Sequence, residues 1–294
     1  MPFTGMALQM DLSMAMGQCL IRKNCRLQKS HFLIGIKFTY NILGGIMKPY
    51  IMQEMTWPEV RDALEQARLA ILPVGSHEQH GPHLAMSTDI AGTEVFARKL
   101  AERTHPLALL GPPLNYGISI HHMHFPGTLT LQPETFEKVL LDVAASFREH
   151  GIQKILVVNG HGGNQHVLDI ASVKMQRDLD IRMAYTLWPV AGGGAVAEQI
   201  AGKRIGHACQ FETSVMMSLR PDLVRKDALA EGEIQPSIYG DVDTGGIDGF
   251  AYWDEYTTNG ALEGAPDADP ETGEKIIEAA LDKIAAFVHK FAEI

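Results

Sequence analysis

The sequence has few cysteines, no long apolar run and no basic stripe. Three cysteines in 294 residues, without regular spacing, exclude a disulfide framework and indicate a reducing compartment, so we expect a cytoplasmic protein. No uninterrupted run of about 18 apolar residues occurs, so we expect no membrane-spanning helix. A formal net charge of -10 without clustered Lys and Arg argues against a nucleic-acid partner.

The beginning of the chain differs from the rest. It is rich in Met, shows no steady periodicity, and lacks the charged segment, apolar segment and cleavage site of a secretory signal. We predict that residues 1–50 are an N-terminal extension, either poorly ordered or the product of an upstream start codon. A targeting peptide is the alternative interpretation. Residues 51–294 are then expected to form a single domain.

From residue 56 onward, helical patterns alternate with short apolar runs. Four runs are typical of buried strands, namely LAILPVG (69–75), PLALLGPPL (106–114), IQKILVVNG (152–160) and IRMAYTLWPV (181–190). Segments with apolar residues at helical spacing separate them, and a long segment of this kind closes the chain. This alternation predicts an α/β fold with a mostly parallel sheet, in which ligands bind beyond the carboxyl ends of the strands.

Nine of the 13 histidines fall in four short stretches, and two of these stretches follow predicted strands. The first contains the segment HEQH (77–80). A zinc-protease helix has its two histidines at i and i+4, whereas the spacing here is three residues. Gly and Pro follow the segment directly, so a loop is expected instead of a helix.

This loop offers ligands for a metal ion. In an extended segment residues two apart point to the same side, so Glu78 and His80 are expected to project together. Asp89 follows just before a predicted helix, whose N-terminus stabilises a carboxylate. One imidazole and two carboxylates suit Zn²⁺, Mn²⁺ or Fe²⁺, and one carboxylate can bridge two ions. The alternative is a solvated polar loop with a capping Asp.

Two further segments carry candidate functional groups. In VVNGHGGN, glycines flank His161 at a predicted strand end, which favours a ligand or catalytic group over a core residue. In HACQFETS, Glu212 opens an apolar helix, where a buried carboxylate requires a cation or donors; the alternative is a first-turn residue stabilised by the helix dipole. His207 is free for proton transfer near neutral pH.

The remaining candidates are second-tier. His121, His122 and His124 lie in a loop marked by Gly and Pro, and any of them could line a substrate pocket, as could Trp188 and Trp253. The chain has no G-x-S-x-G elbow and no Cys with a well-placed His, so hydrolysis by a metal-activated water is the favoured chemistry.

Four segments in order resemble the creatininase (creatinine amidohydrolase) family: LPVGSHEQHGPHLAMSTD, HHMHFPGTLTL, VNGHGGN and HACQFETS. The resemblance runs from about Met55 to the C-terminus. It implies a three-layer α/β/α sandwich, usually a homohexamer, with two divalent metal ions (Zn, Mn or Fe) in each subunit.

The resemblance also implies roles for individual residues. The family's ligand positions are matched by Glu78, His80, Asp89 and His161, with Asp89 as the bridging carboxylate. In creatininase itself the carboxylate of the second metal lies two residues after the histidine of the Gly-rich loop, where this sequence has Gly163. We predict that Glu212 replaces it.

The implied reaction is hydrolysis of the C–N bond of a small cyclic amide or formamide, creatinine or a similar molecule. A hydroxide held between two metals attacks the carbonyl, and His207, at the proton-donor position, protonates the leaving nitrogen. The family also includes formamide deformylases of flavin and deazaflavin biosynthesis and a peptide-trimming peptidase, which are alternatives. Lys203 and Arg204 are the candidates for binding a nucleotide phosphate. The alternative outside enzymes is a catalytically silent metal-binding scaffold.

Overall fold

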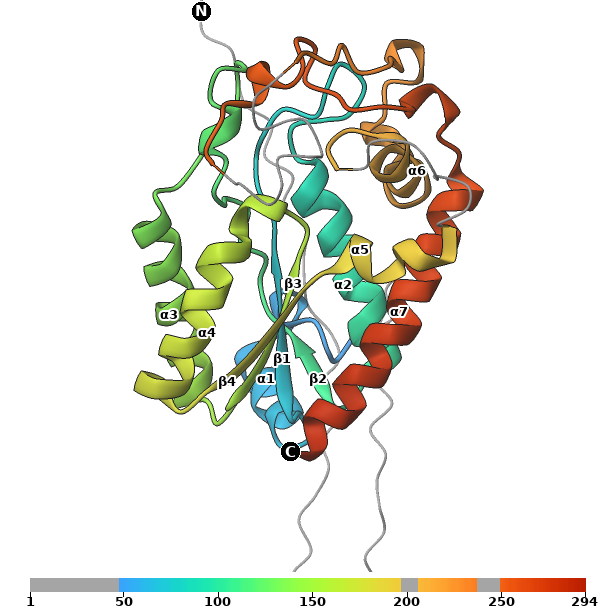
Figure 1. Ribbon diagram of the computed structural model, residues 1–294. Helices are drawn as coiled ribbons and strands as arrows, with labels where there is room; N and C mark the ends of the chain where they lie inside the picture. Colours follow the sequence, from blue (N-terminus) through green and yellow to red (C-terminus); the bar gives the residue numbers. More distant parts are fainter. Residues whose placement is uncertain (1–47, 197–205, 237–248) are drawn as a thin grey trace, which may run out of the picture. The chain divides into compact units, whose positions relative to one another are not determined.

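The computed structural model describes residues 48–196, 206–236 and 249–294 (Figure 1). Nearly all of the predicted extension, residues 1–47, lies outside these ranges, as do Lys203 and Arg204. Within the described ranges, no helix is both long enough and apolar enough to cross a membrane.

The centre of the fold is a parallel sheet with the strand order β2-β1-β3-β4. Its strands are β1 (Leu69–Val74), β2 (Ala108–Leu110), β3 (Lys154–Asn159) and β4 (Arg182–Leu187). All three pairings between neighbouring strands are parallel. The prediction of four strands in a parallel sheet is therefore confirmed.

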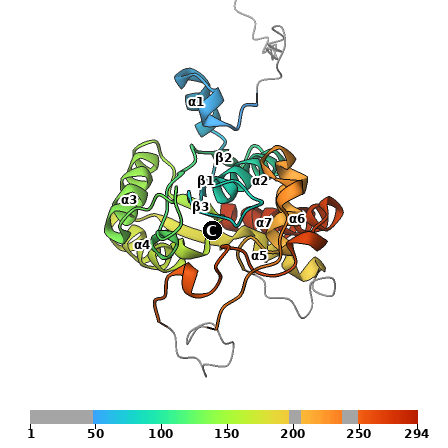
Figure 2. The same cartoon turned by 90° about the horizontal axis from the view of Figure 1, so that it is seen from above.

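Helices cover both faces of this sheet (Figures 1 and 2). One face packs against α2 (Thr88–Thr104) and α7 (Pro270–Glu293), and the other packs against α3 (Pro133–Glu149) and α4 (Gln165–Leu179). Side chains of β1 alternate between the two cores, since Leu69 and Ile71 face α2 and α7 while Leu72 faces α3 and α4. The result is the expected three-layer α/β/α arrangement.

The extents of two strands and one helix were predicted wrongly, and proline explains each case. The second strand covers only 108–110 of the predicted 106–114, which begins with one proline and contains two more near its end. The fourth strand ends at Leu187, and Trp188–Gly192 forms the short helix α5 with Pro189 in its first turn. Proline has no N–H for a strand ladder but fits the first turn of a helix.

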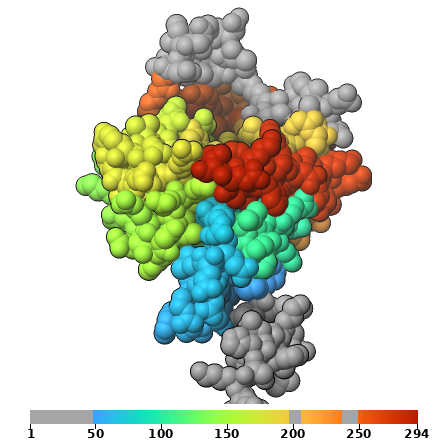
Figure 3. Space-filling model, turned by 90° about the horizontal axis from the view of Figure 1, so that it is seen from below, coloured from blue at the N-terminus to red at the C-terminus, as the bar shows by residue number. Residues whose placement is uncertain are grey.

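The apolar pattern FETSVMMSLRPDLV (211–224) predicts the helix that carries Glu212, but α6 (Gln210–Leu219) is shorter. It ends before Pro221, which lacks the N–H that continues a helix. Near the start of the described residues, α1 (Trp57–Leu64) begins with a capping box between Thr56 and Glu59. In the view from below, the blue segment that contains α1 lies beside green parts of the chain that contain α2 and α3 (Figure 3).

The sheet topology brings two histidine-bearing loops together. β1 and β3 are neighbours, and Val74 pairs with Asn159 at their carboxyl ends. The loop after β3 also donates a hydrogen bond from Gly160 N to Val74 O, at 2.9 Å. A Cβ at Gly160 would lie 2.6 Å from the carbonyl oxygen of Asp89, so glycine is required for the start of α2 to approach this loop.

Candidate metal centre

Four of the predicted ligands meet beyond the ends of β1 and β3. Asp89 lies between two imidazoles, with Oδ1 3.0 Å from His80 Nε2 and Oδ2 3.1 Å from His161 Nδ1. The other nitrogen of His161 lies 3.2 Å from Glu78 Oε2. All four side chains are buried. The two oxygens of Asp89 thus face different histidines, as a bridging carboxylate requires.

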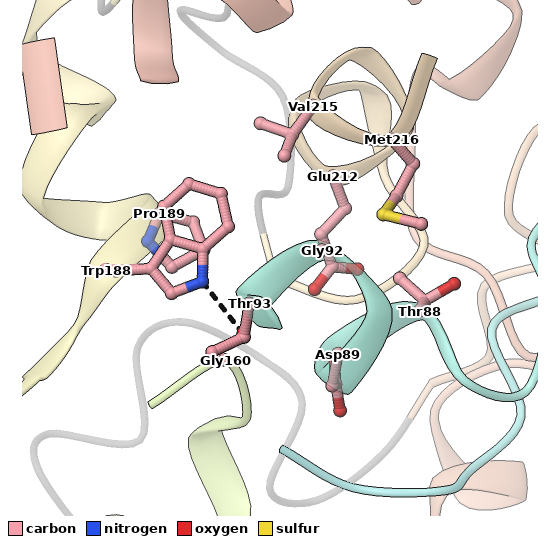
Figure 4. Close-up of a pocket in the computed structure, with 10 residues that line it drawn as sticks. All are labelled: Thr88, Asp89, Gly92, Thr93, Gly160, Trp188, Pro189, Glu212, Val215 and Met216. Atoms are coloured by element: carbon pink, nitrogen blue, oxygen red, sulfur yellow. Dashed lines mark hydrogen bonds between the residues drawn. The ribbon is translucent and has the colours of Figure 1, made fainter. Parts of the chain in front are cut away.

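Glu212 reaches the same cluster from α6. Ligand atoms of His80, Asp89 and Glu212 all lie within 4.8 Å of one another. Figure 4 shows Glu212 on α6 and Asp89 on α2 lining one small cavity, of about 20 Å³, together with Trp188. The backbone N–H of Ala208 donates to Glu212 Oε2 at 2.6 Å and holds the carboxylate in place. Glu212 is therefore brought to the predicted ligands despite its distance in the sequence.

A second group of potential ligands is centred on Glu78. Its ligand atoms lie within 4.8 Å of those of His121 and His161, and also within 4.8 Å of those of His80 and His207. His121 was predicted only to line a pocket. Its position beside Glu78 makes it a further potential ligand, which the sequence pattern HHMH did not distinguish from its neighbours.

The carboxylate of Glu78 shows that the site suits a cation. Both of its oxygens are buried, and neither has a hydrogen-bond partner among the described residues. The imidazoles of His122 and His161 lie 3.3 and 3.2 Å from these oxygens. A buried carboxylate that lacks hydrogen bonds is costly, and a bound cation offsets this cost. The surrounding donors are imidazole nitrogens and carboxylate oxygens, which are the ligands that Zn²⁺ and Mn²⁺ take in proteins. The residues present therefore fit divalent metal ions.

The electrostatics of the cluster point the same way. Burial by itself lowers the pKa of His80, but the adjacent Asp89 outweighs it and raises the pKa to about 10. Burial raises the pKa of Glu212 to about 7, although His80 opposes the shift. Without a cation the cluster thus holds extra protons, and a bound metal ion would displace them.

Two more histidines approach Glu78 without joining the predicted ligand set. His122 Nε2 lies 3.3 Å and His207 Nδ1 lies 3.6 Å from Glu78 Oε1. Burial lowers the pKa of His122 to about 3, and burial together with the neighbouring imidazoles of His80 and His122 lowers the pKa of His207 well below its usual range. Both rings are therefore neutral near pH 7.

The peptide after His207 is held in an unusual conformation. Ala208 has a backbone φ of 48°, a value that residues other than glycine seldom adopt. His83, buried below it, donates from Nε2 to Ala208 O at 3.0 Å and lies 3.1 Å from Thr213 Oγ1. This turn carries His207 on one side and Glu212 on the other, so His83 links the first histidine segment to the fourth.

The tryptophans and the third histidine of HHMH occupy different places. Trp253 lies over the site, with its ring 4.9 Å from that of His122 and 5.1 Å from that of His207. Trp188 is buried in the core, where it stacks on Phe96 at 4.1 Å, so it borders the cavity behind Asp89 and Glu212 and not the histidine side. His124 is exposed and pairs with an Asp at 2.9 Å, away from the cluster.

Several polar residues that hold the site were not found from the sequence. Ser76 donates to Asp89 Oδ2 at 2.6 Å, and Asn164 donates to Gly75 O at 3.1 Å and accepts from Ile118 N at 2.9 Å. The available signal was their position inside the motifs GSHEQH and NGHGGN. That signal does not separate a residue that supports a ligand from one that faces solvent.

Fold and site together define a class: a parallel α/β protein whose strand ends carry a buried cluster of histidines and carboxylates suited to divalent metal ions. The sequence model of the creatininase family, described as creatinine amidohydrolase, matches residues 53–288. This chain therefore belongs to the creatininase family of hydrolases.

Known proteins similar to this chain agree with that assignment. A creatinine amidohydrolase of Pseudomonas putida is 29% identical over 262 residues, which cover 81% of this chain and 95% of that protein. A mycofactocin precursor peptide peptidase of Mycobacterium ulcerans (strain Agy99) is 32% identical over 188 residues, covering 62% of this chain and 66% of the peptidase. The solved structure of a creatininase variant of Zn-Zn type matches with a TM-score of 0.71 and 27% identity, covering 83% of this chain and 98% of that one.

Proposed function

We propose that this protein is a dinuclear metal-dependent amidohydrolase that cleaves the C–N bond of a small cyclic amide or formamide. The observation that carries the proposal is the buried carboxylate of Glu78, which has no hydrogen-bond partner among the described residues and faces imidazole nitrogens. The similarity to a creatinine amidohydrolase and to a creatininase of Zn-Zn type supports it. The homohexamer, the cytoplasmic location and the single domain of residues 51–294 stay predictions.

The cluster divides into two sets of ligands. One ion would be held by Glu78 and His161, and the other by His80 and Glu212, with Asp89 between the two ions. When bound, such ions activate water and polarise a substrate carbonyl. Support for this division comes from Asp89, whose two oxygens face His80 and His161 separately at 3.0 and 3.1 Å.

The remaining residues of the site would bind the substrate and move protons. His207 is neutral and directs Nδ1 toward Glu78, so it can accept a proton there and pass it to the leaving nitrogen. The half-buried ring of Trp253 lies over His122 and His207 and offers an apolar face for a small flat amide.

Metal analysis of the purified full chain tests the proposal. We expect about two equivalents of Zn, Mn or Fe per chain, and fewer in Glu78→Gln and Asp89→Asn. Asp178→Asn is the matched control, because Asp178 is an exposed carboxylate that pairs with Arg177. Metal-free protein whose melting temperature does not change on addition of Zn²⁺ or Mn²⁺ would contradict the two-metal site.

A substrate screen then separates the alternatives. Creatinine, other lactams, hydantoins and formamides represent the proposed class, and short peptides represent the activity named for the peptidase relative. Hydrolysis of a cyclic amide or a formamide, lost after chelation and restored by metal, supports the proposal. Metal-dependent cleavage of peptides alone would replace it with peptidase activity, and a full metal complement without any hydrolysis would indicate a silent scaffold.

A further inference from the structure

Gln79 stands between the candidate ligands Glu78 and His80, and its role in the site is unassigned. Its side chain is buried and surrounded by polar groups from distant segments. Oε1 lies 2.8 Å from the N–H of Gly81. Nε2 lies 3.2 Å from Gly260 O, 2.9 Å from His122 Nδ1 and 3.0 Å from His207 Nε2.

The orientation of this amide follows from two of its neighbours. The backbone N–H of Gly81 can only donate a hydrogen bond, so the atom facing it is the amide oxygen. The carbonyl of Gly260 can only accept, so the atom facing it is the amide nitrogen. If the amide were flipped, its NH₂ group would face the N–H of Gly81, donor against donor. Its oxygen would then face the carbonyl of Gly260, acceptor against acceptor.

The hydrogens of His207 are fixed by the backbone of Gln79. His207 Nε2 lies 2.6 Å from the carbonyl oxygen of Gln79, which can only accept a hydrogen bond. His207 therefore carries a hydrogen on Nε2 and cannot accept one there from the amide. The two hydrogens of the amide are then left for Gly260 O and His122 Nδ1.

The two histidines consequently face Glu78 with different nitrogens. His122 accepts at Nδ1, so it is a neutral ring with its hydrogen on Nε2, and this N–H lies 3.3 Å from Glu78 Oε1. His207 also has its hydrogen on Nε2, so its neutral form directs a bare Nδ1 toward the same oxygen, at 3.6 Å. Beside Glu78 Oε1, His122 thus presents a hydrogen-bond donor and His207 presents an acceptor.

We propose that Gln79 is a positioning residue that sets this division between His122 and His207. Its side chain fixes His122 as a hydrogen-bond donor, and its backbone carbonyl fixes His207 as a proton acceptor. The reaction roles rest on the proposed function: His122 would donate to the substrate carbonyl oxygen, and His207 would take the proton of the attacking water. The hydrogen positions themselves do not depend on it.

Gln79 also connects the site to the segment that carries Trp253. Trp253 Nε1 donates to Gly260 O at 3.0 Å, the same oxygen that accepts from the Gln79 amide. A Cβ at Gly260 would overlap the Gln79 side chain, and the φ of 82° also favours glycine there. One carbonyl thus places the ring that covers the two histidines.

The test is the tautomer of each ring, read from long-range ¹H–¹⁵N spectra of the Zn-loaded full chain with ¹⁵N-labelled His. We expect both His122 and His207 as Nε2–H tautomers in the unaltered protein. In Gln79→Met the side-chain donor is lost while the backbone carbonyl stays, so His122 should leave the pure Nε2–H form and His207 should not change. Thr128→Val is the control, because Thr128 Oγ1 accepts a hydrogen bond from the backbone N–H of Gln79, at 3.2 Å, and not from its side-chain amide.

Kinetics provide the second readout. With a substrate found in the screen, Gln79→Met should lower kcat by about 10- to 100-fold, the usual effect of losing a partner that orients a site residue, with metal content unchanged. An Nδ1–H tautomer of His122 in the unaltered protein overturns the proposal, and this result needs no variant. A changed tautomer with unchanged kcat overturns the positioning role. The expected tautomers in a protein without hydrolase activity would support the assignment of hydrogens and refute the proposed function.

Discussion

Two adjacent glycines in the loop after β3 allow a sharp test of how the cluster is built. A Cβ at Gly163 would overlap the carbonyl oxygen of Ile118 and Nε2 of His161, and would lie 2.9 Å from Cε1 of His121. A Cβ at Gly162 would have no atom within 4 Å. Gly163→Ala must therefore displace a candidate ligand or the backbone that holds it, whereas Gly162→Ala adds a methyl group in open space.

The magnitude follows from this overlap. Inserting a methyl group into packed structure costs about 1–3 kcal/mol. In a protein of this size each kcal/mol lowers the melting temperature by roughly 2–4 °C, so Gly163→Ala should melt about 2–12 °C lower in metal-free form. Displacement of His161 should also reduce metal content. For Gly162→Ala the expected change is within about 0.5 kcal/mol, as for other exposed substitutions.

Thermal melting with and without chelator, together with metal analysis of both variants, measures these effects. Equal melting temperatures and equal metal content in the two variants would refute the reasoning. The same crowding explains why no carboxylate lies two residues after His161, since a longer side chain at Gly163 would also begin inside Ile118 O. Glu212 brings a carboxylate to the cluster from α6.

Two further predictions separate the roles of individual groups. Trp253→Ala should raise KM with little change in melting temperature, because the ring is half-buried over the site, whereas Trp188→Ala should cost about 3–5 kcal/mol of stability as a core truncation; equal losses of stability would contradict this distinction. The metal-free protein should lose stability as the pH rises from about 7 to 10. Folding raises the pKa of His80 to about 10, since Asp89 outweighs its burial, so its contribution is complete below the unfolded value near 6.5 and is lost as the folded group deprotonates. Thermal melts across this range should show the fall in melting temperature in chelated protein. They should not show it in metal-loaded protein, because the metal would already have displaced the proton of His80. Parallel curves of melting temperature against pH for the two forms would count against the raised pKa of His80.

Much of the fold followed from local patterns in the sequence. Short apolar runs separated by helical segments predicted the parallel sheet, and the helical pattern of QHVLDIASVKMQRDL (165–179) has the same bounds as α4. The errors lay at both ends of β2, at Trp188–Gly192 and at Pro221, where proline ended an apolar pattern that continued in the sequence. The spacing of apolar residues indicates which side chains are buried. It does not show where a proline, which lacks a backbone N–H, ends a strand or helix.

The sequence alone determined which strand ends carry the candidate metal ligands. Glu78, His80 and His161 follow β1 and β3 directly, and parallel strands end at one edge of a sheet, so their meeting was predictable once the strands were recognised. Asp89 and Glu212 were candidates from their places at predicted helix starts, and the resemblance to the creatininase family then suggested a bridging role for Asp89 and the place of the missing loop carboxylate for Glu212.

Only the tertiary structure decided which other groups join them. The sequence pattern placed Gln79 and His83 in a loop without a role. Their hydrogen bonds to His207 and Ala208 join residues more than 100 positions apart. Both Trp188 and Trp253 were candidates for lining a pocket. In the structure Trp253 lies over the site, whereas Trp188 is buried in the core. Hydrogen bonds and ring contacts of this kind act over a few ångströms, and the packing of separate segments, not their local pattern, sets those distances.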